Sequence, residues 1–177
     1  MYLPKEVERI LFTREQIAER VRALAETLAR EYADKDPLFL CVLKGASVFF
    51  SDLIREFEAP LEIDFLRASS YVGTDSSGTV SLEASAIPDI KGRDVVLVED
   101  IVDTARTLSL LKKELEARGA ASVKTVCLLD KPSRRVVPDF SADHTGFEIE
   151  DLFVVGYGLD CSQRFRNLPY IGVYNNT

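Results

Sequence analysis

Three carboxylates and two threonines gather in one short segment near the middle of the chain. Four apolar residues, Val95–Val98, are followed at once by Glu99 and Asp100, and then by Asp103, Thr104 and Thr107. Two adjacent carboxylates repel each other unless a cation or hydroxyl groups compensate. Vicinal ribose hydroxyls with Mg²⁺ nearby supply both, so the spacing favours a sugar-phosphate site. The alternative is that Glu99 and Asp100 are solvated acids at the end of a strand.

The elements on either side of these residues would position them. Val95–Val98 is typical of a buried strand, and Leu108–Gly119 of an amphipathic helix with apolar residues at 108, 111 and 115 and a terminal glycine. Ligands of open α/β sheets bind beyond the carboxyl ends of strands, and helix N-termini attract phosphate. The segment therefore predicts an anion cradle beside a group of carboxylates.

Strands and helices alternate along the rest of the chain. Thr13 is expected to cap a helix that extends to about Tyr32, and Lys44–Ser47 is a tight turn into a second helix. Within the predicted strand at 60–66, Ile63 and Phe65 are expected to point inward. A mostly parallel sheet covered by helices is the natural architecture. The further strand predictions are Pro37–Leu43, Pro60–Leu66, Val80–Ala86, Ser122–Leu129, Phe147–Ile149 and Asp151–Val155.

Composition restricts the class of protein. The 177 residues fit one globular domain, and the net charge of −7 argues against binding to nucleic acid or to an anionic membrane. No apolar run reaches the roughly 18 residues of a membrane span. The three cysteines show no metal-ligand spacing, which favours reduced thiols and a cytoplasmic protein. The single histidine, His144, is expected in a surface turn, so catalysis should depend on carboxylates and lysines.

Three segments resemble one known family. Val98–Thr107 is similar to the phosphoribosyl diphosphate (PRPP) signature of the type I phosphoribosyltransferases, in particular of their hypoxanthine-guanine branch. Leu128–Arg135 and Phe153–Asp160 resemble the base-binding segments of that branch. The resemblance implies a type I phosphoribosyltransferase fold: one domain, residues 1–177, with a mostly parallel twisted sheet flanked by helices. A small hood would be formed from the N-terminal and C-terminal segments.

The resemblance also implies a reaction. The protein would be a purine salvage enzyme that uses PRPP and Mg²⁺ to transfer 5-phosphoribosyl to N9 of hypoxanthine or guanine. Members of the family are usually homodimers or homotetramers. A loop at about 69–79, with Ser70 and Tyr71, would close over the site. The resemblance implies that ribose is bound by Glu99 and Asp100, and the 5-phosphate by Asp103, Thr104, Ala105, Arg106 and Thr107, with Asp103 also the general base. Pyrophosphate would be bound by Lys44, Gly45 and Arg166, and the purine by Lys131, Phe153 and Val154. The metal would be held by Asp160 with Glu99 and Asp100.

The chain departs from the family pattern at one position, and the pattern leaves the roles of a few other residues open. The phosphate loop commonly has glycine where this chain has Ala105, and we expect Ala105 to adopt an ordinary helical-entry conformation. Arg106 is either a cation near the phosphate or a solvent-facing side chain. Arg134 and Arg135 are expected to be solvated turn residues. The family often has a cis peptide at the position that corresponds to 43–44.

Two rival functions are consistent with parts of the pattern. A nucleotide-sensing regulator of the same fold would need a basic face, which the net charge of −7 disfavours. A receiver or hydrolase domain could also use acids at strand ends. It would leave the Lys131-Pro132 and Phe153-Val154 pairs unexplained.

Overall fold

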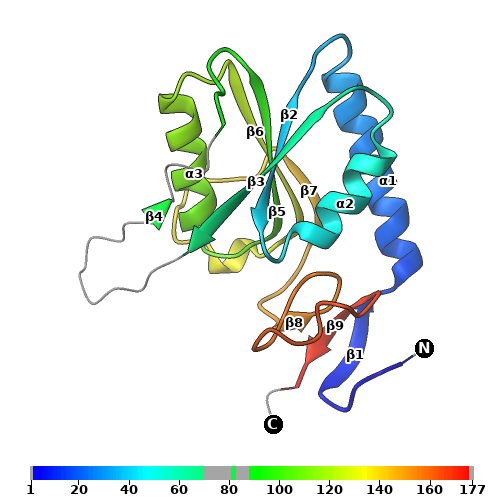
Figure 1. Cartoon of the computed structure of the whole chain (residues 1–177). Helices are drawn as coiled ribbons and strands as arrows, with labels where there is room; N and C mark the ends of the chain where they lie inside the picture. Colours follow the sequence, from blue (N-terminus) through cyan, green and yellow to red (C-terminus); the bar gives the residue numbers. More distant parts are fainter. Residues whose placement is uncertain (1, 70–80, 83–87, 176–177) are drawn as a thin grey trace.

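A mixed α/β architecture is seen in the computed structural model, which describes residues 2–69, 81–82 and 88–175 (Figure 1). The predicted loop at 69–79, with Ser70 and Tyr71, lies outside the described residues except for Ser69, the last residue of a strand. Within the described part of the chain, no helix is long and apolar enough to cross a membrane.

The larger sheet has six strands in the order β4-β3-β2-β5-β6-β7. The five strands from β3 to β7 in this order pair in parallel, whereas β4 pairs antiparallel with β3. This arrangement confirms the predicted mostly parallel sheet. The bounds are β2 (Leu38–Leu43), β3 (Glu62–Ser69), β4 (Ser81–Leu82), β5 (Asp94–Val102), β6 (Ser122–Asp130) and β7 (His144–Glu148).

Helices cover both faces of this sheet, with α1 (Arg14–Glu31) and α2 (Ser47–Glu56) on one side and α3 (Arg106–Ala117) on the other (Figure 1). Alternate residues of the central strands enter two separate cores. Phe39 and Val96 belong to the core under α1 and α2, while Leu40 and Leu97 belong to the core under α3. Because both faces are buried, the strands are continuous apolar runs rather than alternating ones.

The helix ends follow local sequence signals. Thr13 caps α1 as predicted: its side chain accepts from the Gln16 amide, and the Gln16 side chain accepts from the Thr13 amide. Gly119, just after α3, has a φ of +86°, the left-handed conformation that ends many helices. The bounds of α1 and α3 therefore agree with the predictions to within two residues.

A second, three-stranded sheet joins the two ends of the chain. Its order is β1 (Val7–Phe12), β9 (Ile171–Tyr174) and β8 (Val154–Val155), all antiparallel. Figure 1 shows it beyond the carboxyl ends of the large sheet. This sheet is the predicted hood, and it brings the 153–166 region to the edge where β2 and β5 end.

The predictions for three residues are wrong. Ile63 and Phe65 do not point into the core but are 46% and 43% exposed, although the Phe65 ring lies 5.6 Å from the ring of Phe50 in α2. His144 is not in a turn: it begins β7, and its Nε2 lies 2.7 Å from Glu31 Oε2 of α1. A cross-element partner of this kind is invisible in a local pattern.

Candidate active site

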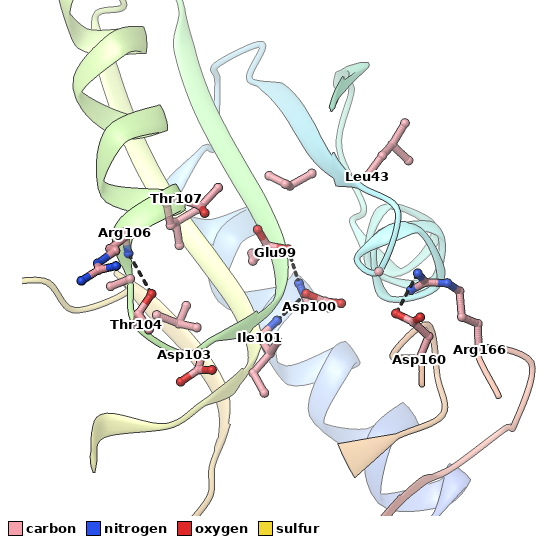
Figure 2. A pocket seen from close by; sticks show the side chains of 15 residues that line it. Leu43, Glu99, Asp100, Ile101, Asp103, Thr104, Arg106, Thr107, Asp160 and Arg166 are labelled. Atoms are coloured by element: carbon pink, nitrogen blue, oxygen red, sulfur yellow. Dashed lines mark hydrogen bonds and ion pairs between the residues drawn. The ribbon is translucent and has the colours of Figure 1, made fainter. Parts of the chain in front are cut away.

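A polar cavity of about 540 Å³ opens at the carboxyl ends of β2 and β5 (Figure 2). It contains most of the residues that the sequence singled out, and Figure 2 shows Glu99 and Asp100 between the loop before α3 and the Asp160–Arg166 pair. Its lining residues are Val42, Leu43, Gly45, Glu99, Asp100, Ile101, Val102, Asp103, Thr104, Ala105, Arg106, Thr107, Leu108, Asp160 and Arg166.

The cavity exists because two neighbouring strands separate. β2 and β5 pair from Leu38↔Val95 to Cys41↔Val98, whereas β5 continues beside β6 to Val102↔Asp130. The helix after β2 covers one face of the sheet and the helix after β5 covers the other (Figure 1). In open α/β sheets, a crevice forms between two adjacent strands whose following helices lie on opposite faces of the sheet. Glu99 and Asp100 are therefore residues of β5 itself, not of the loop that follows it.

Neither of the two adjacent acids forms an ion pair with a described side chain. Each carboxylate accepts from the next backbone amide, Glu99 Oε1 from Asp100 N at 3.1 Å and Asp100 Oδ1 from Ile101 N at 2.8 Å. Burial, reinforced by the negative charge of Asp100, raises the pKa of Glu99 well above its ordinary value. Burial also raises the pKa of Asp100, although its hydrogen bonds and the charge of Arg166 oppose this shift. The free pair therefore favours a bound cation or proton.

Gly45 is required by the close approach of the turn after β2. A Cβ atom on Gly45 would lie 1.6 Å from Asp100 Oδ2, so any larger residue would displace the Asp100 carboxylate. The preceding peptide, Leu43–Lys44, is cis, as the family resemblance implied. Lys44 does not line the cavity, and its Nζ lies 3.5 Å from Gln163 Oε1. Gly158 packs against the same turn: a Cβ there would lie 2.1 Å from the Gly45 carbonyl oxygen.

The predicted phosphate loop, residues 103–107, forms one wall of the cavity. It leads into α3, whose first amides have no partner within the helix. Thr104 Oγ1 lies 3.4 Å from the Arg106 amide and orients the turn, while the Arg106 side chain is exposed. All five residues of the loop are brought together as predicted.

Ala105 does not have the ordinary helical-entry conformation that we expected. Its φ of +65° and ψ of 4° are left-handed. The tight turn from β5 into α3 imposes this conformation, which explains why glycine is common there in the family. The methyl group is nevertheless buried, 5% exposed, within the core under α3.

Asp160 and Arg166 form the opposite wall. Arg166 Nη2 pairs with Asp160 Oδ1 at 2.8 Å, and Arg166 Nη1 donates to the Gly158 carbonyl at 2.7 Å. Asp160 Oδ2 accepts from the Gln163 amide at 2.7 Å. An acid and a cation are thus fixed facing Glu99 and Asp100 across the cavity (Figure 2).

The predicted purine-binding residues lie outside the lining of this cavity. Lys131 follows β6 and is only 7% exposed, and its amide donates to the Val102 carbonyl at 2.9 Å. Phe153 is 47% exposed, with its ring 5.5 Å from the ring of Tyr174. Val154 is a buried residue of β8. The Lys131–Val102 hydrogen bond joins the segment predicted to bind the purine directly to the strand that carries the acids.

The prediction that Arg135 is a solvated turn residue is wrong. It forms a buried ion pair with Asp130 and donates to the Asp103 carbonyl at 2.8 Å. Arg134 is exposed, but its Nε lies 3.1 Å from Asp103 Oδ1. Sequence reasoning missed both contacts. The only available signal was the position of both arginines just after β6, the strand beside β5.

The donor set of the cavity fits a hard divalent cation. Glu99, Asp100 and Asp160 offer only oxygen ligands, as Mg²⁺ prefers. Among the described residues, no group of three or more His, Cys, Asp or Glu side chains converges closely enough to hold a metal alone. A Mg²⁺ ion here would complete its shell with water and substrate oxygens, which is common for this ion.

Comparison with known proteins gives one consistent result. The family model described as the phosphoribosyl transferase domain matches residues 10–162. Over 172 residues the chain is 48% identical to the hypoxanthine-guanine phosphoribosyltransferase of Lactococcus lactis, covering 97% of this chain and 93% of that protein. It is 47% identical to the Bacillus subtilis protein of the same name, covering 95% and 93%.

Solved structures agree with the sequence comparison. The crystal structure of a hypoxanthine-guanine phosphoribosyltransferase from Bacillus anthracis superimposes with a TM-score of 0.88 at 40% identity. The superposition covers 96% of this chain and 99% of that chain.

Substitution of Ala105 tests the left-handed turn. Relief of the left-handed conformation in Ala105→Gly contributes about 1–2 kcal/mol. Loss of the buried methyl group, about 0.8 kcal/mol, and the freer unfolded glycine chain, about 0.5–1 kcal/mol, offset it. We expect the free energy of unfolding in urea to change by less than about 1 kcal/mol. Ala105→Val should lose about 2–3 kcal/mol, because a β-branched residue is strained there. Equal stability of the two variants would contradict the assigned conformation.

The raised pKa of Glu99 predicts a pH-dependent effect on stability. The folded protein binds a proton at Glu99 more tightly than the unfolded chain, so stability decreases as pH rises from about 4.5 through the raised pKa. Glu99→Gln lacks this group and should have a higher Tm than the parent at pH 8, without added Mg²⁺ or PRPP. The difference should disappear near pH 4.5. Glu116→Gln, on the exposed side of α3, is the control; a gain for Glu99→Gln that is independent of pH would exclude the electrostatic cause.

Proposed function

The chain belongs to the phosphoribosyl transferase family, and from this premise we propose that it transfers 5-phosphoribosyl from PRPP to N9 of hypoxanthine or guanine, giving IMP or GMP and pyrophosphate. The observation that carries the proposal is the cavity in which Glu99 and Asp100 lie between an anion-binding loop and the Asp160–Arg166 pair. A ribose with phosphate groups at both ends, as in PRPP, matches this order of groups.

The central part of PRPP would be bound by the two strand acids and the loop before α3. Glu99 and Asp100 would accept hydrogen bonds from the 2- and 3-hydroxyls of ribose. Residues 103–107 would hold the 5-phosphate through their amides and the threonine hydroxyls. The position of this loop at the N-terminus of α3 supports the assignment, since helix N-termini favour anions.

The pyrophosphate end of PRPP would lie on the opposite wall. Gly45 and Arg166 line the cavity there, and Lys44 lies in the same turn. The Gly45 backbone is accessible to an anion because the residue has no side chain, and Arg166 provides a fixed positive charge beside it. Local cations of this kind allow a chain with a net charge of −7 to bind a polyanion.

The purine would be recognised by the segments after β6 and β7. Lys131 would donate to the 6-oxo group, Phe153 would stack on the ring, and the Val154 backbone would contact the Watson–Crick edge. The exposed ring of Phe153 and the buried, anchored position of Lys131 support these roles. A fixed donor at the 6-position disfavours adenine, whose amino group offers no matching acceptor.

The geometry supports a dissociative transfer of the ribosyl group. As the bond from C1 to pyrophosphate breaks, the ribose ring becomes positively charged, and Glu99 and Asp100 are placed to stabilise that charge. Asp103 would accept the proton from purine N7 while N9 forms the new bond to C1. Asp160, with Glu99 and Asp100, would hold Mg²⁺, whose contribution is to neutralise the diphosphate.

Two further properties remain predictions from the family resemblance. We propose a homodimer or homotetramer and a cytoplasmic location. The three unpaired cysteines, Cys41, Cys127 and Cys161, are in keeping with a reducing compartment.

A panel of bases tests the proposed reaction. The purified protein with PRPP and Mg²⁺ should release pyrophosphate with hypoxanthine and guanine, and should do so far more slowly with adenine and uracil. Removal of the divalent cation with EDTA should abolish release, and added Mg²⁺ should restore it. A preference for uracil, or no turnover with any 6-oxopurine, would exclude the proposed function.

Asp103→Asn tests the general base. Because an amide cannot accept the N7 proton, we expect kcat to fall by about 10²–10⁴-fold, with a smaller change in the affinity for IMP. Steady-state kinetics and nucleotide titration measure the two quantities separately. Asp139→Asn, an exposed acid outside the cavity, is the matched control. Unchanged turnover in Asp103→Asn would remove Asp103 from this role.

A further inference from the structure

Four charged side chains of alternating sign form a continuous line at the carboxyl edge of the sheet. Lys131 Nζ lies 3.7 Å from Asp151 Oδ1, and the other oxygen of Asp151 lies 3.6 Å from Arg134 Nη1. Arg134 Nε lies 3.1 Å from Asp103 Oδ1. The line therefore begins at the residue proposed to bind the purine 6-oxo group and ends at the residue proposed to bind N7.

Local structure fixes both ends of this line. Lys131 and Arg134 are joined by a single 3-10 turn, in which the Arg134 amide donates to the Lys131 carbonyl at 3.1 Å. The backbone of Asp103 is held by Arg135, which donates to its carbonyl at 2.8 Å. Among the ion pairs of the described residues, those of Arg134 and Asp151 link these two anchored points.

Stability does not explain the two middle residues. The Arg134 and Asp151 side chains are 49% and 52% exposed, and the Asp103 side chain is 42% exposed. Ion pairs with this exposure contribute little to folding, because water and salt screen them. A line of such pairs that connects two substrate-facing groups is better explained by a role in orienting those groups.

We propose that Arg134 and Asp151 are positioning residues that set the spacing between the Lys131 donor and the Asp103 acceptor, and thereby the selectivity for 6-oxopurines. A 6-oxopurine protonated at N7 presents an acceptor, O6, directly beside a donor, N7–H. A cation and a carboxylate held at the two ends of one line of ion pairs would match that edge. Adenine presents an amino donor at the first position and would face Lys131 donor to donor. The inference rests on the proposed function.

The guanidinium of Arg134 suits this role because it is planar and has several donors in fixed directions. It contacts Asp103 through Nε and Asp151 through Nη1 at the same time. The contact with Arg134 uses Oδ1 of Asp103; its other oxygen, Oδ2, has no ion pair with a described residue and would face the purine. A lysine at 134 would be a single point charge and could not hold both acids in fixed directions.

Three variants and one control test the proposal: Arg134→Gln, Arg134→Lys, Asp151→Asn and Arg118→Gln. Arg118, just after α3, forms a part-buried ion pair with Glu114, outside the lining of the cavity. We expect kcat/KM for hypoxanthine to fall about 10–100-fold in Arg134→Gln and Asp151→Asn, the size of effect that misplaced reacting groups produce. The ratio of hypoxanthine to adenine turnover should fall with it. KM for PRPP and the Tm should stay close to those of the parent, as in Arg118→Gln.

Further measurements distinguish the simultaneous contact of Arg134 with two carboxylates from the effect of a positive charge at this position. Arg134→Lys should restore less than half of the lost kcat/KM, and the double variant Arg134→Gln/Asp151→Asn should be no worse than either single variant, because both changes break one line. Parent-like kcat/KM for hypoxanthine in Arg134→Gln, full restoration by lysine, or independent effects in the double variant would each overturn the proposal. A rise in KM for PRPP that equals the loss for hypoxanthine would also overturn it. A parent protein that is inactive with every 6-oxopurine would instead refute the proposed function.

Discussion

The separation of β2 from β5 beyond the Cys41↔Val98 pair is the constraint on which the site depends. Because β5 continues beside β6 after β2 has turned away, Glu99 and Asp100 are held on a rigid strand yet face an open cavity. The turn after β2 then passes so close to Asp100 that a residue larger than glycine at position 45 would displace the Asp100 carboxylate. The loop into α3 must also turn sharply, which imposes the left-handed conformation on Ala105. One topological feature therefore accounts for the acids, the glycine and the strained loop.

Electrostatics in this cavity serve binding at the expense of the free protein. Burial of Glu99 beside Asp100 raises the pKa of Glu99. The two carboxylates repel each other in the unliganded site, and a bound cation would reduce that repulsion. Arg166 is fixed by Asp160 and by the Gly158 carbonyl and provides positive charge on the opposite wall. Strong local fields of opposite sign within about 540 Å³ allow an acidic chain to bind a substrate that carries both phosphates and a developing positive charge.

The neighbouring strand β6 connects the two substrate-binding regions. Lys131 and Arg135 follow β6, and both donate to the backbone at the end of β5, at Val102 and Asp103. Arg135 can be buried there because it pairs with Asp130, which avoids the large penalty for an unpaired buried charge. The segment proposed to bind the purine and the loop proposed to bind the 5-phosphate are therefore joined by hydrogen bonds. Arg134 and Asp151 extend this connection from the backbone to the side chains.

Sequence patterns alone predict the parallel α/β class, the cap at Thr13 and the clustering of the 99–107 segment, because each depends mainly on residues close together in the chain. The family resemblance also predicted Gly45, Asp160 and Arg166 as site residues, and all three line the cavity. Only the tertiary structure decided the exposure of Ile63 and Phe65, the pairing of His144 with Glu31 and the burial of Arg135, since each depends on a partner from another element. Ala105 shows the same limit at short range. Its residue type favours a helical conformation, but the direction in which β5 must turn to reach α3 forces a positive φ.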